Sequence, residues 1–375
     1  MFQGKNMLFF EIIEWIPGYC ENISSFAGME RRIRKYLYPI SLIYSGVTRF
    51  RNYLYDKGIW ASATYDIPLI NIGNLQVGGT GKSPMTEYLV RLLKPRYRVA
   101  VLSRGYKRKT KGFLLAHRGM TAADIGDEAL QLFEKHPGIL VAVDADRVHG
   151  INLLLRHPRP PEVILLDDAM QHRRISAGLN ILLTPYGDLY TGDKMLPAGN
   201  LREPVPGARR AQIIVVSKCP PHLSEARQFE IARQLQVDLT QTVFFSTIVY
   251  EDHVRSARGM LTWDELKDYT VLLVTGIADP SHLLKELEAK GIRYIHKRYP
   301  DHHAFSYRDI RAVREAFEAI SGHKKIILTT GKDYVRIFDR LDGIYFVPMR
   351  TEFISHGKDF DQMILQYVEQ STENR

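Results

Sequence analysis

The sequence predicts an α/β protein in which a P-loop unit, with a mostly parallel sheet and helices on both faces, precedes a second, smaller α/β unit. From residue 67 onward, short all-apolar runs alternate with amphipathic segments, which is typical of parallel strands covered by helices. A glycine-rich turn, VGGTGKSP at residues 77–84, directly follows the first apolar run. The 375 residues are enough for two units of ordinary size.

The overall charge of the chain favours an anionic partner. Lysine and arginine number 51 against 42 acidic residues, which gives a net charge of +9 and a pI near 9.3. Nucleic acid, an acidic membrane surface and a phosphorylated substrate all fit this charge. The two cysteines, Cys20 and Cys219, are far apart and provide neither a disulfide framework nor metal-ligand spacing. A reducing compartment is therefore expected.

The N-terminal part of the chain predicts a helix at a membrane interface. Residues 1–28 are interpreted as an extension of uncertain role, and residues 29–60 as a basic, aromatic helix. The apolar stretch at residues 36–47 is about a dozen residues long, against about 20 for a bilayer span. Arginines flank it and tyrosines interleave with it, as in helices that lie in an anionic interface. The alternative is an amphipathic helix packed on its own domain.

The first α/β unit is placed at residues 61–240. Residues 67–73 predict a strand that ends at the glycine-rich turn, and residues 82–94 predict the next helix, with Pro84 in its first turn. A long loop from Pro185 to Arg210 is expected to be functional. A further helix is predicted at residues 126–136, and further strands at residues 98–103, 139–144, 163–168, 180–184 and 212–217.

The second, smaller α/β unit is placed at residues 241–375. Residues 243–250 predict a connecting strand, and residues 270–280 predict a strand, a glycine turn and the start of a helix. Further strands, with helices between them, are predicted at residues 292–301, 326–333 and 344–349.

The turn after the first strand has the features of a phosphate-binding P-loop. Its glycine N–H groups can turn toward phosphate oxygens, Lys82 can reach the β- and γ-phosphates, and Ser83 can place its hydroxyl on Mg²⁺. Gln76 stands where the pattern has its first glycine, but the residues nearest the helix are intact. The alternative is a chance GKS at a helix N-terminus. The predicted nucleotide-binding residues are Gly78, Gly79, Thr80, Gly81, Lys82 and Ser83.

An acidic partner for the P-loop follows another apolar run. Asp167 and Asp168 end the segment VILLDD, and one of them is expected to hold Mg²⁺, as a Walker B aspartate does. The alternative is an ordinary acidic turn at a strand end. The nearest match to a guanine-reading N/T-K-x-D motif is SKCP at 217–220, which has Pro220 in place of the aspartate. Proline cannot accept hydrogen bonds from guanine, so ATP is the predicted nucleotide.

Six further motifs, together with the P-loop and the basic aromatic helix, resemble the tetraacyldisaccharide 4′-kinase family, the lipid A 4′-kinases. The resemblance runs from about Met29 to the end of the chain. The loop of that family, of the VGGTGK[ST]P type, also lacks the first glycine of the P-loop pattern. The motifs are LSRGY (102–106), GDE (126–128), DADR (144–147), DDAMQH (167–172), GNLREP (199–204) and DHHAF (301–305).

The resemblance implies an enzyme of lipid A biosynthesis. It implies an ATP- and Mg²⁺-dependent kinase that phosphorylates the 4′-hydroxyl of tetraacyldisaccharide 1-phosphate. Such an enzyme would be peripheral or shallowly anchored at the cytoplasmic face of a bacterial inner membrane. Its expected partners are the lipid substrate and an anionic membrane surface, with neither nucleic acid nor an obligate protein partner.

The resemblance also implies the site residues. Asp127 would be the base that takes the proton of the sugar hydroxyl, and His302 would orient it and tune its pKa. Glu128 would join the Mg²⁺ ligands. Without the family, Asp127 is typical of a carboxylate favoured by a helix dipole and His302 of a surface turn. Candidate contacts to phosphate or to Mg²⁺-bound water are Arg104, Arg147, Gln171, His172 and Arg202.

One departure from the family and two rival functions complete the interpretation. TTGKD, at 329–333, has Gly331 where the resemblance implies an acid, so the chain departs from the family at this position. The first rival is a membrane-associated P-loop ATPase that acts as a switch and releases phosphate with or without lipid. The second is a nucleic-acid-binding NTPase, which only the basic charge supports. Deletion of residues 1–28 is expected to leave activity intact.

Overall fold

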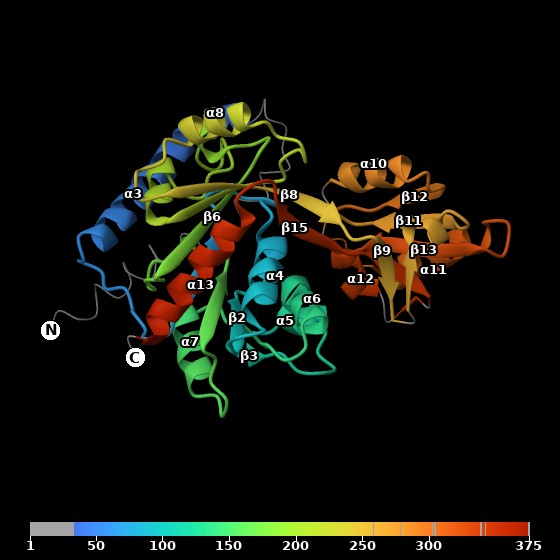
Figure 1. The fold of residues 1–375 in the computed structure, drawn as a ribbon, viewed down its shortest axis with the longest axis horizontal. Helices are drawn as coiled ribbons and strands as arrows, with labels where there is room; N and C mark the ends of the chain where they lie inside the picture. Colours follow the sequence, from blue (N-terminus) through green and yellow to red (C-terminus); the bar gives the residue numbers. More distant parts are fainter. Residues whose placement is uncertain are drawn as a thin grey trace.

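The chain forms an α/β fold with a large, mostly parallel sheet and a second, smaller mixed sheet (Figure 1). The computed structural model describes residues 34–257, 259–277, 279–301, 303, 305–337, 340–341 and 343–373. Residues 1–28 and His302 lie outside the described residues, so what the sequence predicts for them stays a prediction.

The large sheet has nine strands in the order β15-β8-β7-β6-β1-β5-β2-β4-β3. β1 is central and parallel to both β5 and β6. Every residue of β1 is buried, as expected for a strand covered on both faces. In chain order these strands are β1 (Leu69–Gly73), β2 (Val99–Ser103), β3 (Leu114–Leu115), β4 (Leu140–Val143), β5 (Val163–Asp167), β6 (Leu179–Pro185), β7 (Ile213–Ser217), β8 (Thr242–Tyr250) and β15 (Met349–Phe353).

Helices cover both faces of the large sheet. On one face, Leu89 of α4, Leu130 of α6 and Ile364 of α13 join the strands in one buried apolar cluster. On the other face, α7 and α8 contribute Ile151 and Ile231 to two further clusters. The helices of this part are α4 (Lys82–Leu93), α5 (Ala122–Ile125), α6 (Asp127–Lys135), α7 (Arg147–Leu155), α8 (Glu225–Leu235) and α13 (Gly357–Glu373), with the 3₁₀ turns η3 (Tyr190–Gly192) and η4 (Val205–Arg210) in the long loop.

The smaller sheet has six strands in the order β10-β9-β14-β13-β11-β12, and helices cover both of its faces. β11, β12, β13 and β14 are parallel, whereas β9 and β10 are antiparallel. The elements are β9 (His253–Ser256), β10 (Gly259–Thr262), α9 (Trp263–Leu266), β11 (Thr270–Thr275), α10 (Ser281–Ala289), β12 (Tyr294–Arg298), α11 (Tyr307–Glu318), β13 (Lys325–Thr330), α12 (Gly331–Ile337) and β14 (Ile344–Val347).

The two sheets divide the chain differently from the boundary predicted at residue 240. β8 pairs with β7 through its first half and with β15 through its second half, and it leads directly into β9, so it connects the two sheets as predicted. β15 and α13 return the chain to the large sheet (Figure 1). The smaller sheet is therefore built from residues 251–348, called here the smaller unit, inserted between β8 and β15. The remaining described residues form the larger unit.

The basic aromatic segment forms one long helix on the larger unit. The 3₁₀ turn η2 (Lys35–Leu37) leads into α3 (Tyr38–Asp56). Tyr44 and Tyr55 of α3 are buried. Among the described residues, no helix combines the length and the apolar character needed to cross a membrane.

Candidate active site

The P-loop lies where the sequence predicts it, between β1 and α4. Gly78 and Gly81 adopt positive φ angles of 110° and 90°, which a residue with a side chain adopts only with strain. The side chain of Thr80 accepts a hydrogen bond from Asn74 at 2.9 Å, and its carbonyl accepts one from Ser217 at 2.7 Å. The loop is thus held from β1 and from the end of β7. Backbone N–H groups at this helix N-terminus can bind phosphate.

Position 76 does not require a glycine, because the backbone there is extended and pairs with the GNLREP segment. Gln76 forms an antiparallel bridge with Leu201, and the next residue, Val77, donates to the carbonyl of Asn200 at 2.8 Å. The Gln76 side chain is buried. The GNLREP segment therefore supports the P-loop directly, which accounts for the missing first glycine of the pattern.

The two aspartates after β5 lie beside the P-loop lysine, in contrasting surroundings. Asp168 is 3.6 Å from Lys82 Nζ and accepts a hydrogen bond from Arg202 at 2.9 Å. Burial raises the pKa of Asp168, but Lys82, Arg202 and Arg147 outweigh it and hold that pKa well below its usual range. For Asp167, burial and the neighbouring charges of Glu128 and Asp168 raise the pKa to about 7.

The residues present at this edge fit a divalent cation. Asp167 Oδ1 and Asp168 Oδ1 are buried and accept no hydrogen bond from the described residues. A cation would satisfy these oxygens and offset the repulsion that raises the pKa of Asp167. No cluster of three or more His, Cys, Asp or Glu within the described chain could hold a metal by itself. The donor set therefore suits Mg²⁺, which is usually held by one or two carboxylates, a hydroxyl and phosphate oxygens.

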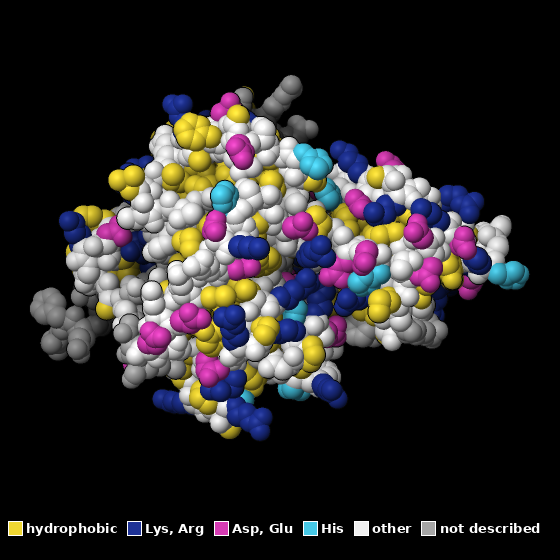
Figure 2. Space-filling model, viewed as in Figure 1, with side chains coloured by type: hydrophobic (Ala, Val, Ile, Leu, Met, Phe, Trp, Pro, Cys, Tyr) yellow, Lys and Arg dark blue, Asp and Glu magenta, His cyan; other side chains and the backbone are white. Residues whose placement is uncertain are grey.

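Asp127 and Glu128 begin α6 at the junction of the two units, and α12 of the smaller unit pairs with both. Glu128 Oε1 accepts from Ser83 Oγ at 2.8 Å and from Lys332 Nζ at 2.9 Å. Burial raises the pKa of Glu128, but Lys332, Ser83 and Lys82 lower it to about 2. Asp127 Oδ2 accepts from Arg336 at 2.8 Å and 2.5 Å. Figure 2 shows Lys and Arg side chains gathered where the larger and smaller units meet.

The DHH turn contributes its second histidine to the structure of the smaller unit. His303 Nε2 lies 3.0 Å from Asp309 Oδ2, in the first turn of α11, and the ring stacks on Tyr299. His302, the predicted partner of Asp127, lies outside the described residues. A Cβ built on Gly276 would lie 3.4 Å from the His303 Cβ and 3.0 Å from Asp333, the neighbour of Lys332. The turn and α12 are therefore neighbours across Gly276.

The five predicted substrate residues have different surroundings. Arg202 pairs with Asp168, as described. Arg147 is buried, and burial together with the charge of Arg104 lowers its pKa to about 10 against the opposing pull of Asp168. Gln171 donates to the carbonyl of Asn74 at 2.8 Å, at the start of the P-loop. Burial and Arg147 lower the pKa of His172 to about 3. Four of the five therefore lie around the aspartate pair, and Arg104 is exposed close to them.

Lys218 is a further candidate site residue, which the sequence signalled only through the incomplete SKCP motif. β7 ends two strands from β1 at the same edge of the sheet, and Lys218 follows it with a positive φ of 57°. A Cβ built on Gly79 would lie 3.7 Å from Lys218 Nζ. Burial and the charge of Lys332 lower the Lys218 pKa. An anionic ligand at the P-loop would therefore stabilise the charged form of Lys218.

The inner face of α3 and Arg34, which precedes η2, are anchored on the loops that carry these residues. Arg34 donates to the carbonyl of Pro197 at 3.0 Å and to the side chain of Asn200 at 3.0 Å. Tyr44 Oη donates to the carbonyl of Arg202 at 2.7 Å, and Arg51 donates to the carbonyl of Gln171 at 2.7 Å. The helix therefore runs beside the candidate substrate residues.

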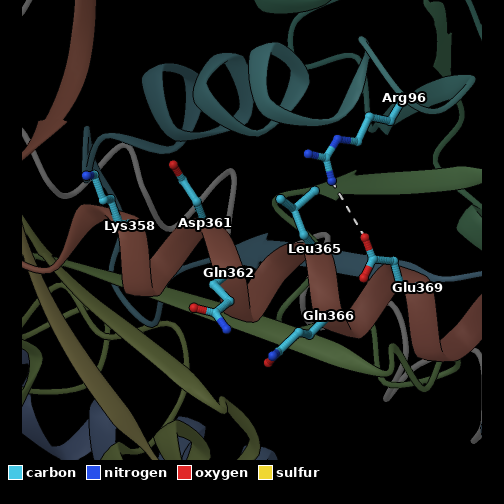
Figure 3. Close-up of a pocket in the computed structure, with 7 residues that line it drawn as sticks. All are labelled: Arg96, Lys358, Asp361, Gln362, Leu365, Gln366 and Glu369. Carbon is cyan, nitrogen blue, oxygen red and sulfur yellow. Dashed lines mark ion pairs between the residues drawn. The ribbon is translucent and has the colours of Figure 1, made fainter.

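A separate hollow lies on the outer side of α13 (Figure 3). It has a volume of about 400 Å³. Arg96, after α4, meets Glu369 of α13 at 3.6 Å across one end of it, and both side chains are exposed. No candidate site residue lines this hollow, so we assign it no part in the chemistry. Its lining residues are Arg96, Lys358, Asp361, Gln362, Leu365, Gln366 and Glu369.

Comparisons with known proteins give one consistent family. Residues 33–369 match the sequence model described as tetraacyldisaccharide-1-P 4′-kinase. A tetraacyldisaccharide 4′-kinase of Flavobacterium johnsoniae is 46% identical over 343 residues, which cover 91% of this chain and 99% of that protein. One from Bacteroides thetaiotaomicron is 42% identical over 362 residues, which cover 92% and 95%. The crystal structure of LpxK from Aquifex aeolicus in complex with ATP matches with a TM-score of 0.73 and 30% identity, covering 90% of this chain and 99% of that one.

Proposed function

The chain belongs to the tetraacyldisaccharide-1-P 4′-kinase family, and from that premise we propose how its residues carry out the reaction. Its activity is that of a tetraacyldisaccharide 4′-kinase in lipid A biosynthesis. The proposed reaction transfers the γ-phosphoryl group of ATP to the 4′-hydroxyl of tetraacyldisaccharide 1-phosphate. The observation that carries this assignment is the sheet edge where Lys82 and Ser83 lie beside Asp168 and Glu128.

ATP binds at the P-loop in this proposal. Gly78, Gly79, Thr80 and Gly81 would hold the phosphates through backbone N–H groups, and glycine at the positive φ angles of positions 78 and 81 permits the turn of the loop. Lys82 moves from Asp168 toward the β- and γ-phosphates, since a phosphate group carries more charge than a carboxylate.

Asp167, Asp168 and Ser83 would hold Mg²⁺, with Glu128 as a further ligand. The unsatisfied oxygens of the two aspartates and the raised pKa of Asp167 support this set. Bound Mg²⁺ would supply positive charge that neutralises the phosphate oxygens. The family relative from Aquifex aeolicus, described as a complex with ATP, supports the nucleotide but names no metal.

Asp127 acts as the general base. Its side chain is 21% exposed, so a sugar hydroxyl can reach it. His302 orients it in this proposal. The proximity of the DHH turn to α12, which pairs with Asp127, supports that role. Arg104, Arg147, Gln171, His172 and Arg202 bind phosphate groups of the lipid or water on Mg²⁺, because Arg forms paired hydrogen bonds with oxyanions.

We propose that α3 lies on the anionic surface of the bacterial inner membrane, at its cytoplasmic face, without crossing it. The side opposite its anchored face exposes large apolar side chains. Ile43 is 70% exposed and Phe50 is 52% exposed, and Tyr36 in the preceding turn η2 is 86% exposed. The anchoring of α3 on the GNLREP segment would bring the lipid substrate next to Arg202.

The test measures transfer of radiolabelled γ-phosphate from ATP to tetraacyldisaccharide 1-phosphate in detergent micelles. Wild type, Asp127→Asn and Glu369→Gln are assayed side by side. We expect labelled lipid from wild type and Glu369→Gln, because the exposed Arg96–Glu369 pair contributes little. Asp127→Asn should lose about 100-fold or more in kcat, the usual loss of a general base.

The alternative is a membrane-associated P-loop ATPase switch, and the same assay separates the two functions. Free labelled phosphate released equally with and without lipid, and no labelled lipid, would support the switch. Labelled lipid at a normal rate from Asp127→Asn would instead leave the kinase intact and remove Asp127 from the role of base.

A further inference from the structure

The first turn of α12 packs closely against the first turns of α6. Gly331 begins α12, and a Cβ built on it would lie 2.9 Å from Gln131 Nε2 of α6. A side chain at this position would displace the end of the Gln131 side chain. The close approach of α12 to α6 brings the basic residues of α12 within reach of Asp127 and Glu128.

Two basic residues of α12 form two ion pairs with two adjacent acids of α6. Lys332 and Arg336 are four residues apart and therefore lie on one face of their helix. Lys332 Nζ is 2.9 Å from Glu128 Oε1. Arg336 donates from Nε and Nη2 to the same oxygen of Asp127, at 2.8 Å and 2.5 Å. Each acid of the GDE motif thus has a cationic partner from the smaller unit.

The smaller unit fixes the guanidinium of Arg336 on its far side. The Arg336 side chain is only 7% exposed, and its Nη1 donates to Asp333 Oδ1 at 3.0 Å. Asp333 is fully buried, and its other oxygen accepts from the N–H of Gly276 and from Thr330 Oγ1, both at 2.8 Å. The chain of contacts runs from the end of β11, through Asp333 and Arg336, to Asp127 in the larger unit.

We propose that Arg336 is a positioning residue for phosphoryl transfer and that it acts through Asp127. The guanidinium, held by Asp333, fixes the orientation of the Asp127 carboxylate and keeps it at the entrance of α6, where the sugar hydroxyl arrives. The inference rests on the proposed role of Asp127 as the base. Correct placement of a base to within a fraction of an ångström decides much of its catalytic effect.

A purely structural ion pair between the two units predicts a different result. Loss of such a pair would lower the stability of the protein and change the KM for ATP and kcat together, because the two units would separate. Loss of a positioning contact lowers kcat, leaves the KM for ATP unchanged, and has no further effect once Asp127 itself has been replaced.

The experiment compares Arg336→Gln, Arg336→Lys, Asp127→Asn and the double variant Arg336→Gln/Asp127→Asn with wild type. Arg311→Gln is the matched control, because Arg311 is an exposed arginine of the same unit that pairs with Glu315 of its own helix. Transfer of labelled phosphate to tetraacyldisaccharide 1-phosphate gives kcat and both KM values. Binding of ATP without lipid and the thermal midpoint of each variant are also measured. Arg336→Gln leaves the buried Asp333 carboxylate without its cationic partner, which could unfold the protein. The double variant Arg336→Gln/Asp333→Asn removes that charge as well, so it tests the loss of Arg336 in a protein that folds.

We expect kcat to fall about 30-fold or more in Arg336→Gln, less in Arg336→Lys, and not at all in Arg311→Gln, with the KM for ATP within about threefold of wild type. The double variant with Asp127→Asn should be no slower than Asp127→Asn alone. A normal kcat in folded Arg336→Gln, or additive losses in the double variant, would overturn the inference while the base assignment stands. Normal activity of Asp127→Asn would overturn both.

Discussion

At the scale of single residues, the site places two adjacent aspartates in opposite electrostatic surroundings. Asp168 lies between Lys82 and Arg202, which keep its pKa low, whereas burial and nearby carboxylates raise the pKa of Asp167 to about 7. Neighbouring groups whose pKa values are driven apart are typical of sites that bind a cation or transfer a proton. Asp168 is therefore already stabilised by cationic side chains, whereas a metal ion would stabilise Asp167 more.

Sequence patterns predicted those residues of the site that belong to contiguous motifs. The GKS of the P-loop and the aspartates after an apolar run have fixed positions relative to their strands, and parallel strands bring their ends to one edge. Arg336 and Lys332 were not predicted as site residues, because nothing in the sequence relates residues 332 and 336 to residues 127 and 128. Lys218 was not predicted for another reason. The motif that contains it, SKCP, has Pro220 in place of the required aspartate.

His136 gives a prediction about the dependence of stability on pH. Its ring is buried at the end of α6, and neither ring nitrogen has a hydrogen-bond partner among the described residues. Burial, together with Lys94, Arg91 and Lys135, lowers its pKa to about 4 from an ordinary value of 6.5. The unfolded chain therefore binds a proton below pH 6.5 that the folded protein does not. Stability should fall as the pH decreases from 6.5 toward 4.

The measurement is urea-induced unfolding of wild type and His136→Leu at pH 7, 6 and 5. Below pH 6.5, wild type should lose about 1.4 kcal/mol per pH unit more than His136→Leu, the effect of one proton bound only by the unfolded state. If the free energy of unfolding changed equally with pH in the two proteins, His136 would not be buried in its neutral form.

At the scale of elements, the strands and helices that carry the site agree closely with the predicted ones. The strand predicted at residues 67–73 is β1 (Leu69–Gly73), and the helix predicted at residues 82–94 is α4 (Lys82–Leu93). A short all-apolar run that ends at a glycine-rich turn is typical of a buried parallel strand. The partners of β8 could not be predicted, because β15 joins it from a segment about a hundred residues further along the chain, and edge pairing leaves no periodic signal.

The two faces of α3 give a prediction about membrane association. Ile43 lies on the exposed face, whereas Tyr44 is buried and anchors the helix to Arg202. Ile43→Glu should weaken binding to vesicles of anionic phospholipid by roughly tenfold, since it removes one apolar contact and adds a repelled charge. Phe229→Glu, on the exposed face of α8, is the matched control and should bind as wild type does.

Co-sedimentation with vesicles that contain phosphatidylglycerol measures this binding. ATP binding in the absence of vesicles should be equal for Ile43→Glu, Phe229→Glu and wild type. If Ile43→Glu and Phe229→Glu weakened vesicle binding equally, the membrane contact would not be specific to α3.

At the scale of the whole molecule, one aromatic cluster joins segments from both ends of the chain. Phe360 of α13 is fully buried and contacts the rings of Phe244 in β8, Phe353 in β15 and Tyr88 in α4. Phe360→Ala should destabilise the larger unit by about 3–5 kcal/mol, the usual effect of removing a buried aromatic ring. Lys358→Ala, two residues earlier on the exposed side of α13, should change stability by less than about 0.5 kcal/mol.

Chemical denaturation followed by tryptophan fluorescence, together with ATP binding, tests this expectation. Phe360→Ala should unfold at lower urea concentration and lose ATP binding over the same range, because the P-loop belongs to the destabilised unit. Loss of the smaller unit alone, with ATP binding retained, would show that α13 does not support the larger sheet.

The insertion of residues 251–348 between β8 and β15 has a consequence for synthesis on the ribosome. The strands of the P-loop sheet emerge first, but the edge strand and the helix that complete that sheet are made only after residue 348. The inserted unit, which has its own two apolar clusters, can fold as soon as it has emerged. One apolar face of the large sheet therefore stays partly uncovered until β15 and α13 have been made. The inserted unit is made before them and can fold first. A nascent chain arrested near residue 350 is the species in which chaperone protection would matter most.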